Sequence, residues 1–129
     1  MEVLVKHLSR LMFAAFTIAT AALAYAAPFN DAQFEAAQAA GKPVLVTVQA
    51  DWCPTCAKQQ PVVNELLLRE DMKGFQQFTI DFDRQKPLLK RFGVQMQSTL
   101  VVFKGRQEVG RSTGETTKQR ISALLRKAL

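Results

Sequence analysis

The two cysteines of this 129-residue chain, Cys53 and Cys56, are separated by two residues and lie where one sequence pattern gives way to another. Before them, residues 44–49 are β-branched and almost continuously apolar, which is typical of a strand buried on both faces. After them, residues 57 to about 69 place apolar side chains on one helical face. We therefore predict that the cysteine pair joins a central strand to a helix, and that other elements cover both faces of that strand.

A helix start is recognisable ahead of this strand. Asn30 is placed as an N-cap, Gln33 completes a capping box, and Phe29 and Phe34 are spaced as a hydrophobic staple. These signals predict a helix that ends near residue 40.

The remaining patterns predict three more strands and two more helices. They are a strand at residues 78–83, a short helix at 87–92 closed by Gly93, and a hairpin of strands 99–103 and 108–112 with its turn at 104–107. The last helix is predicted from a capping box of Thr116 and Gln119 and an apolar stripe of Ile121, Leu124, Leu125 and Leu129. The order α-β-α-β-α-β-β-α predicts an α/β fold with a four-stranded mixed sheet and helices on both faces.

The first 26 residues have the pattern of a signal peptide. A positive n-region, an apolar h-region and a small-x-small cleavage site are formed by Lys6, His7 and Arg10, by residues 11–23, and by Ala24-Tyr25-Ala26. The competing interpretation is an uncleaved membrane anchor, for which the uncharged run only reaches the low end of spanning length. We expect residues 1–26 to be removed, leaving residues 27–129 as one exported, periplasmic domain.

Charge and histidine content exclude several functions. The formal net charge is +6, but the basic residues are scattered among acidic ones, so a solvated surface is favoured and no nucleic-acid partner is expected. The single histidine, His7, lies in the predicted signal peptide. A closed zinc site and a cysteine-protease dyad both need ligands or bases that the remaining domain lacks. We expect no metal site and no cofactor.

The cysteine pair itself suits redox chemistry. A helix N-terminus supplies free N–H groups and a partial positive charge, both of which favour a thiolate. Cys53, nearer the open end, is the expected attacking thiolate, and Cys56 is the expected resolving thiol. An inert structural disulfide is the alternative, although so short a loop restricts the unfolded chain little. Trp52 either packs beside the motif or offers a flat contact to a substrate.

Several motifs together resemble the thioredoxin family, specifically its exported members, over residues 29–129. They are Trp52-Cys53-Pro54-Thr55-Cys56, Pro61 inside the following helix, residues 80–83, Phe92-Gly93-Val94, and Lys104-Gly105 after the third strand. The resemblance implies a thioredoxin-like fold and a thiol-disulfide oxidoreductase with no cofactor beyond its own dithiol. It also implies substrate contacts at Trp52, Pro54, Thr55, Ser98 and Thr99. The expected partners are substrate proteins with cysteines or disulfides, and a membrane protein that donates or accepts electrons.

Three residues depart from the family pattern. Ser98 stands where the family usually has a cis-proline facing the disulfide, Thr47 where many members have a buried acid, and Gln49 where a tryptophan is common. A cis bond before Ser98 would cost about 3–4 kcal/mol, so we predict a trans bond or a distorted loop. Without an acid at residue 47, deprotonation of Cys56 must rely on water or another group.

These observations leave three hypotheses for function. The leading one is an exported oxidoreductase that reduces or isomerises substrate disulfides through Cys53 and Cys56. The second is a non-catalytic thioredoxin-fold binding module, suggested by Ser98 and Thr47. The third is a metal or iron–sulfur binder that uses the same two cysteines, because the family's proline helps to keep metals away from the dithiol.

Overall fold

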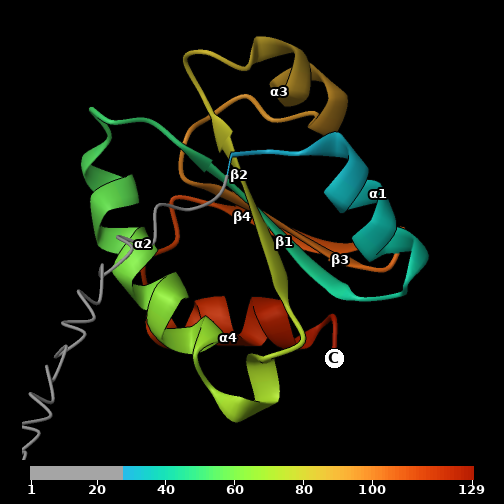
Figure 1. The fold of residues 1–129 in the computed structure, drawn as a ribbon. Coiled ribbons are helices and arrows are strands. Elements are labelled where there is room, and N and C mark those ends of the chain that lie inside the picture. The colour runs from blue at the N-terminus through green and yellow to red at the C-terminus, as the bar shows by residue number, and fades with distance from the viewer. Residues whose placement is uncertain (1–27) are drawn as a thin grey trace, which may run out of the picture.

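The computed structural model describes residues 28–129, and Figure 1 shows their arrangement. The elements are α1 (Asp31–Ala39), β1 (Pro43–Gln49), α2 (Pro54–Leu67), the 3₁₀ turn η1 (Glu70–Met72), β2 (Gln76–Asp81), α3 (Lys86–Phe92), β3 (Thr99–Lys104), β4 (Gln107–Thr113) and α4 (Lys118–Arg126). The predicted order of four helices and four strands is confirmed. The predicted signal peptide lies outside the described residues.

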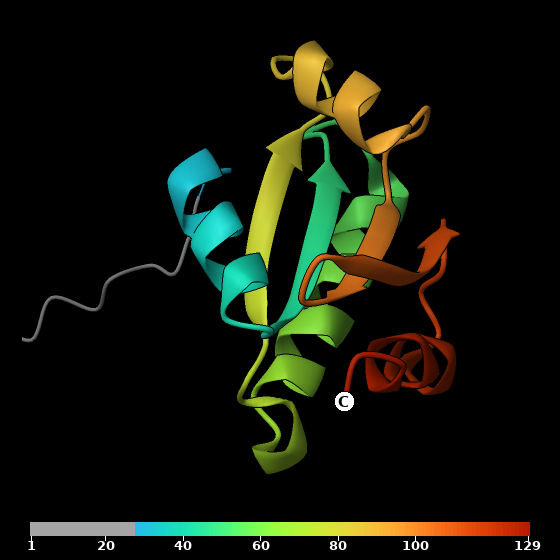
Figure 2. The same cartoon turned by 90° about the vertical axis from the view of Figure 1, so that its right-hand side faces the viewer.

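The four strands form one mixed sheet in the order β2-β1-β3-β4. Figure 2 shows them side by side, from β2 in yellow to β4 in orange-red. β1 pairs with β2 in parallel and with β3 antiparallel, and β3 and β4 form the predicted hairpin. β1 is thus central, as its continuous apolar pattern predicts.

Alternate residues of β1 build the two halves of the core. Val44, Val46 and Val48 pack on the side that α1 and α3 cover, and Leu45 packs on the side that α2 and α4 cover (Figure 1). Strand geometry requires this alternation, because successive side chains point to opposite faces. All four of these side chains are completely buried. The end of β1, after which the cysteine motif follows, is therefore held firmly in the core.

Two of the signals predicted for α1, the N-cap and the hydrophobic staple, are confirmed. The side chain of Asn30 accepts a hydrogen bond from the N–H of Gln33 at 2.9 Å, and the rings of Phe29 and Phe34 lie 5.2 Å apart. The helix ends at Ala39, one residue before the predicted end.

β2 lies two residues earlier than predicted, at residues 76–81 instead of 78–83. Its position is set by pairing with β1, in which Val44 lies opposite Gln76 and Gln49 opposite Asp81. The carboxylate of Asp81 then accepts hydrogen bonds from the N–H groups of Asp83 and Arg84, at 2.9 and 3.0 Å. The chain turns away from the sheet there, although its apolar–polar alternation continues to residue 83.

The predicted start of α4 is wrong. Thr117, not Thr116, is the N-cap, and it makes no side-chain cap bond. The carboxylate of Glu115 instead accepts hydrogen bonds from the N–H groups of Thr116 and Thr117, at 3.0 and 2.7 Å. The predicted apolar stripe also ends early, because Leu129 lies beyond the helix and is 48% exposed, whereas Ala128 is buried.

Among residues 28–129, the helices are too short or too polar for any of them to cross a bilayer.

Candidate active site

Cys53 and Cys56 form a disulfide at the start of α2, with their Cα atoms 5.3 Å apart. The helix begins at Pro54, three residues before the predicted start, because Cys53 is itself the N-cap. Its Sγ accepts a hydrogen bond from the N–H of Cys56 at 3.0 Å. One of the otherwise unpaired N–H groups of the helix N-terminus is therefore aimed at a sulfur atom.

The disulfide is covered by apolar neighbours. Cys53 is 3% exposed and Cys56 is 5% exposed, and both pack against Ala50 and Phe82. Exposure therefore does not separate the attacking from the resolving cysteine. Cys53 differs from Cys56 in its position at the end of the helix and in the N–H group that its sulfur accepts.

The predicted substrate contacts next to the disulfide differ in exposure. Trp52 is 58% exposed, and its indole N–H donates to the carboxylate of Asp83 at 2.8 Å. Its ring meets that of Phe82 edge-on, with centroids 6.4 Å apart. Pro54 is exposed and Thr55 is half-buried. Trp52 and Pro54 thus flank the buried disulfide on the surface.

Ser98 lies against both sulfur atoms. Its Oγ is 3.1 Å from Sγ of Cys53 and 3.2 Å from Sγ of Cys56, and the residue is 2% exposed. The peptide bonds of residues 28–129 are all trans, and Ser98 has a φ of 59°, in the left-handed region that side chains other than glycine rarely adopt. The prediction was a trans bond or a distorted loop, and the structure has a trans bond together with a positive φ at Ser98.

The backbone of Ser98 is fully engaged within the domain. Its N–H donates to the carbonyl of Val48 at 2.8 Å, and its carbonyl accepts from the N–H of Gly114 at 3.0 Å and from Nε2 of Gln59 at 3.1 Å. The same Nε2 also donates to the carbonyl of Glu115 at 2.8 Å. Gln59 is 3% exposed and ties α2 to two loops.

Gln59 is not among the site residues predicted from the sequence, although its position carries a signal. Gln59 is spaced four residues before Val63 and seven before Leu66, which places a polar residue on the apolar face of α2. A buried amide needs hydrogen-bond partners. That position therefore predicts a polar contact across the core.

Thr99 is buried and its hydroxyl points to partners other than the sulfur atoms. It donates to the carbonyl of Met96 at 2.7 Å and lies 2.9 Å from the hydroxyl of Thr113. Met96, which the sequence analysis did not single out, is 53% exposed in the same loop. This loop therefore presents Met96 to solvent and keeps Ser98 and Thr99 inside.

The other two departures from the family pattern serve contacts between elements. Thr47 is 1% exposed, and its hydroxyl lies 3.0 Å from that of Thr79 on β2. The side chain of Gln49 donates to Gln60 of α2, which in turn donates to Asn64 at 2.8 Å. The described hydrogen bonds of Thr47 do not reach either cysteine. Among residues 28–129, the hydroxyl with a described contact to the sulfur atoms is that of Ser98.

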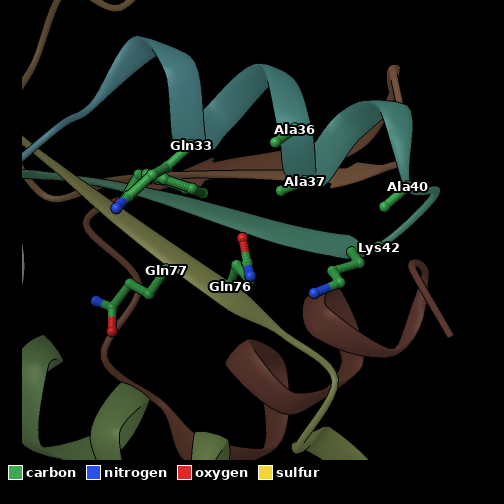
Figure 3. Close-up of a pocket in the computed structure, with 8 residues that line it drawn as sticks. Gln33, Ala36, Ala37, Ala40, Lys42, Gln76 and Gln77 are labelled. Carbon is green, nitrogen blue, oxygen red and sulfur yellow. The ribbon is translucent and has the colours of Figure 1, made fainter.

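Two hollows lie along β2. One, of about 510 Å³, is beside the cysteine motif and is lined by Pro28, Gln49, Ala50, Asp51, Thr79, Asp81, Arg84 and Gln85. The other, of about 450 Å³, lies at the opposite end of the strand pair, where Figure 3 shows the side chain of Gln76 pointing toward α1 and that of Gln77 pointing away from it. Residues 28–129 contain no cluster of three or more His, Cys, Asp or Glu side chains that could share a metal ion.

Comparison with known proteins agrees with this architecture. The thioredoxin family model matches residues 26–127. Thioredoxin 1 of Nostoc is 32% identical over 87 residues, which cover 67% of this chain and 80% of the relative. A thioredoxin of Alicyclobacillus acidocaldarius is 31% identical over 74% of this chain and 90% of its own. The crystal structure of Trxlp from Edwardsiella tarda has 44% identity and a TM-score of 0.74, covering 76% of this chain and 95% of that one.

A family match over most of the chain thus coincides with a CysXXCys disulfide that begins a helix after a central strand. The chain belongs to the thioredoxin family and is a thiol-disulfide oxidoreductase.

Proposed function

We propose that this domain reduces or isomerises disulfides of exported proteins through a mixed disulfide between Cys53 and a substrate cysteine. The observation that carries the proposal is the position of Cys53 as the N-cap of α2, where its sulfur accepts the N–H of Cys56. The same N–H stabilises a thiolate at Cys53 once the disulfide is reduced, because it donates to the charged form.

The reaction is a two-step exchange. The thiolate of Cys53 attacks a substrate disulfide, so that a bond from Cys53 to one substrate sulfur forms and the substrate disulfide breaks. The released substrate thiolate takes a proton from water. Cys56 then loses its proton to water and attacks Cys53, which restores the Cys53–Cys56 disulfide and releases the second substrate thiolate. Two electrons pass from the domain to the substrate.

We propose Trp52 and Pro54 as the surface on which the substrate lies. Both are exposed on either side of Cys53, and the hydrogen bond from Trp52 to Asp83 holds the indole ring in place. A large ring held in this way offers apolar contact area without much further loss of conformational entropy. The exposed Met96 from the loop before β3 adds a flexible apolar contact.

The proposal includes export, and therefore an electron partner at the membrane. The pattern of residues 1–26 supports secretion, and the domain must be returned to the dithiol form after each turnover. A membrane protein that donates electrons to this domain would keep it reduced, as a reductase or isomerase requires. A membrane protein that accepts electrons from the domain would make it an oxidant of its substrates.

Turnover of insulin disulfides with dithiothreitol as the electron donor tests the catalytic step. Wild-type protein is expected to accelerate insulin precipitation, whereas Cys53→Ser is expected to be inactive. Cys56→Ser is expected to accumulate a mixed disulfide at Cys53, visible by mass spectrometry under non-reducing conditions. Wild-type activity no higher than that of Cys53→Ser would refute the catalytic proposal and favour a binding module.

The reduction potential of the cysteine pair separates the directions of electron flow. Equilibration with glutathione buffers is expected to give a value near the roughly −270 mV typical of thioredoxins, as a reductase requires. A value close to the roughly −120 mV of strong oxidants would instead make the domain a disulfide donor. Metal analysis of the anaerobically reduced protein addresses the remaining hypothesis, since bound metal would favour a metal or cluster carrier.

A further inference from the structure

We infer that Ser98 is an additional catalytic residue, whose hydroxyl donates a hydrogen bond to the Cys53 thiolate and accepts one from the Cys56 thiol. This inference rests on the proposed exchange reaction at the same two cysteines. It assigns a chemical role to the side chain that replaces the family's usual proline.

The position of the hydroxyl carries the inference. Oγ of Ser98 lies 3.1 Å from one sulfur and 3.2 Å from the other, within hydrogen-bonding distance of both. A hydroxyl has one donor and two acceptor lone pairs. When the disulfide opens, one sulfur becomes a thiolate that needs a donor and the other a thiol that needs an acceptor. A single hydroxyl between them can satisfy both.

The loop is built to hold the hydroxyl in this place. Ser98 has a φ of 59°, a backbone conformation that is costly for a residue with a Cβ atom. Such a conformation persists only where the surroundings hold it. Here the carbonyl of Val48, the N–H of Gly114 and the amide of Gln59 all bond to the backbone of Ser98.

The surroundings strengthen the hydrogen bond from the Ser98 hydroxyl to sulfur, because the site is nearly closed to water. Ser98, Cys53 and Cys56 are each at most 5% exposed, so water competes little for the sulfur atoms. Two nearby carboxylates have other partners, since Asp83 accepts from Trp52 and Glu115 accepts from the N–H groups before α4, while the exposed Asp51 precedes the motif by two residues. The described donors to the sulfur of Cys53 are therefore the N–H of Cys56 and the hydroxyl of Ser98.

The direction of the effect follows from the charge. A hydrogen bond to an ionised sulfur is stronger than one to a neutral disulfide. The hydroxyl therefore lowers the pKa of Cys53 and favours the reduced form over the disulfide. Removal of the hydroxyl should raise the pKa and make the reduction potential more negative.

Two substitutions remove the hydroxyl and differ in their effect on the backbone at residue 98. Ser98→Ala keeps the Cβ atom and its cost at a positive φ, whereas Ser98→Gly relieves that cost. Ser112→Ala is the matched control, because Ser112 on β4 has a buried hydroxyl with no hydrogen-bond partner and no described contact with the sulfur atoms. The pKa of Cys53 is measured in each reduced protein from the pH dependence of iodoacetamide alkylation, with the labelled site identified by mass spectrometry.

Both Ser98 variants are expected to raise the pKa of Cys53 by about one unit, which is about a tenfold loss of thiolate below both pKa values. At a pH above both pKa values, both are expected to favour the disulfide about tenfold in glutathione buffers, equal to about 30 mV for a two-electron couple. Ser112→Ala should match wild type. An unchanged pKa in both Ser98 variants, or a change in only one, would overturn the role of the hydroxyl. These readouts do not need a protein substrate, so they remain informative if insulin reduction fails.

Discussion

At the scale of single residues, the site depends on a polar connection across the core. Gln59 of α2 donates to the carbonyl of Ser98 and to that of Glu115, and so fixes the loop before β3 to the helix that begins with Cys53. We assign Gln59 as a positioning residue, since it bonds to the backbone of Ser98 and has no described contact with the sulfur atoms.

Gln59→Met keeps the length of the side chain and removes both hydrogen bonds. The free energy of unfolding, measured by urea denaturation, is expected to fall by about 1–2 kcal/mol, because the carbonyl of Glu115 loses a buried donor and that of Ser98 keeps only Gly114. The pKa of Cys53 should also rise, because the loop no longer holds the Ser98 hydroxyl as firmly. Gln119→Met, at an exposed position of α4, is the control. A loss of stability with no change in the pKa of Cys53 would show that Gln59 supports the fold without positioning the hydroxyl.

At the scale of elements, α4 is joined to the active-site region through the loop that precedes it. The carboxylate of Glu115 accepts the N–H groups of the two residues before this helix, and its backbone carbonyl is one of the two that Gln59 reaches. The pKa of Glu115 is lowered from its ordinary value, chiefly because the carboxylate accepts the N–H of Thr117. The folded state therefore favours the ionised form of this side chain.

Glu115→Gln keeps a carbonyl oxygen near the same N–H groups and removes the charge. Since the folded-state pKa of Glu115 is lowered, its charge stabilises the fold above the unfolded-state pKa of about 4.3, and this stabilisation is lost as the pH falls through the folded-state value. The variant is expected to unfold at lower urea concentration than wild type at pH 7, with the difference narrowing as the pH is lowered below about 4.3. Glu70→Gln, in which an acid 87% exposed is replaced, should follow wild type at both pH values. A difference that is the same at pH 7 and at low pH would contradict an effect of the charge.

At the scale of the whole molecule, the first described residues bear on the proposed processing, because they already contact the fold. Pro28 already contacts the sheet through a single parallel bridge to Thr79, and Phe29 packs on the α1 side of the core. Cleavage after Ala26 would therefore keep both of these contacts. The proposed processing is compatible with an intact domain.

Expression of the full chain in a Gram-negative host tests the proposed export. The intact mass of the protein from the periplasmic fraction is expected to correspond to a chain that begins at Ala27. Ala26→Leu, which removes the small residue before the cleavage site, should remain at full length in the membrane fraction. Full-length wild-type protein in that fraction would support the uncleaved anchor instead.

The local features of this protein were predictable because each is contained in a short window of sequence. The cap and staple of α1, the continuous apolar run of β1 and the strand–CysXXCys–helix junction were all confirmed. Errors occurred where a local pattern continued past the point at which a tertiary contact ended the element. β2 stops at Asp81, whose carboxylate accepts the N–H groups of Asp83 and Arg84 as the chain turns, and α4 begins after Thr117, whose own N–H is bound by the carboxylate of Glu115.

The redox pair is predictable from the sequence alone, because the spacing of Cys53 and Cys56 and their place before a helix are local properties. The residues that face the pair depend on how remote segments pack together. β3 pairs antiparallel with β1, with Leu100 opposite Thr47, and this register brings the N–H of Ser98 to the carbonyl of Val48 at the end of β1. The hydroxyl of Ser98 thereby reaches a cysteine 45 residues away in the chain. No periodicity within either segment encodes that distance, because it arises from the pairing of strands that are remote in sequence.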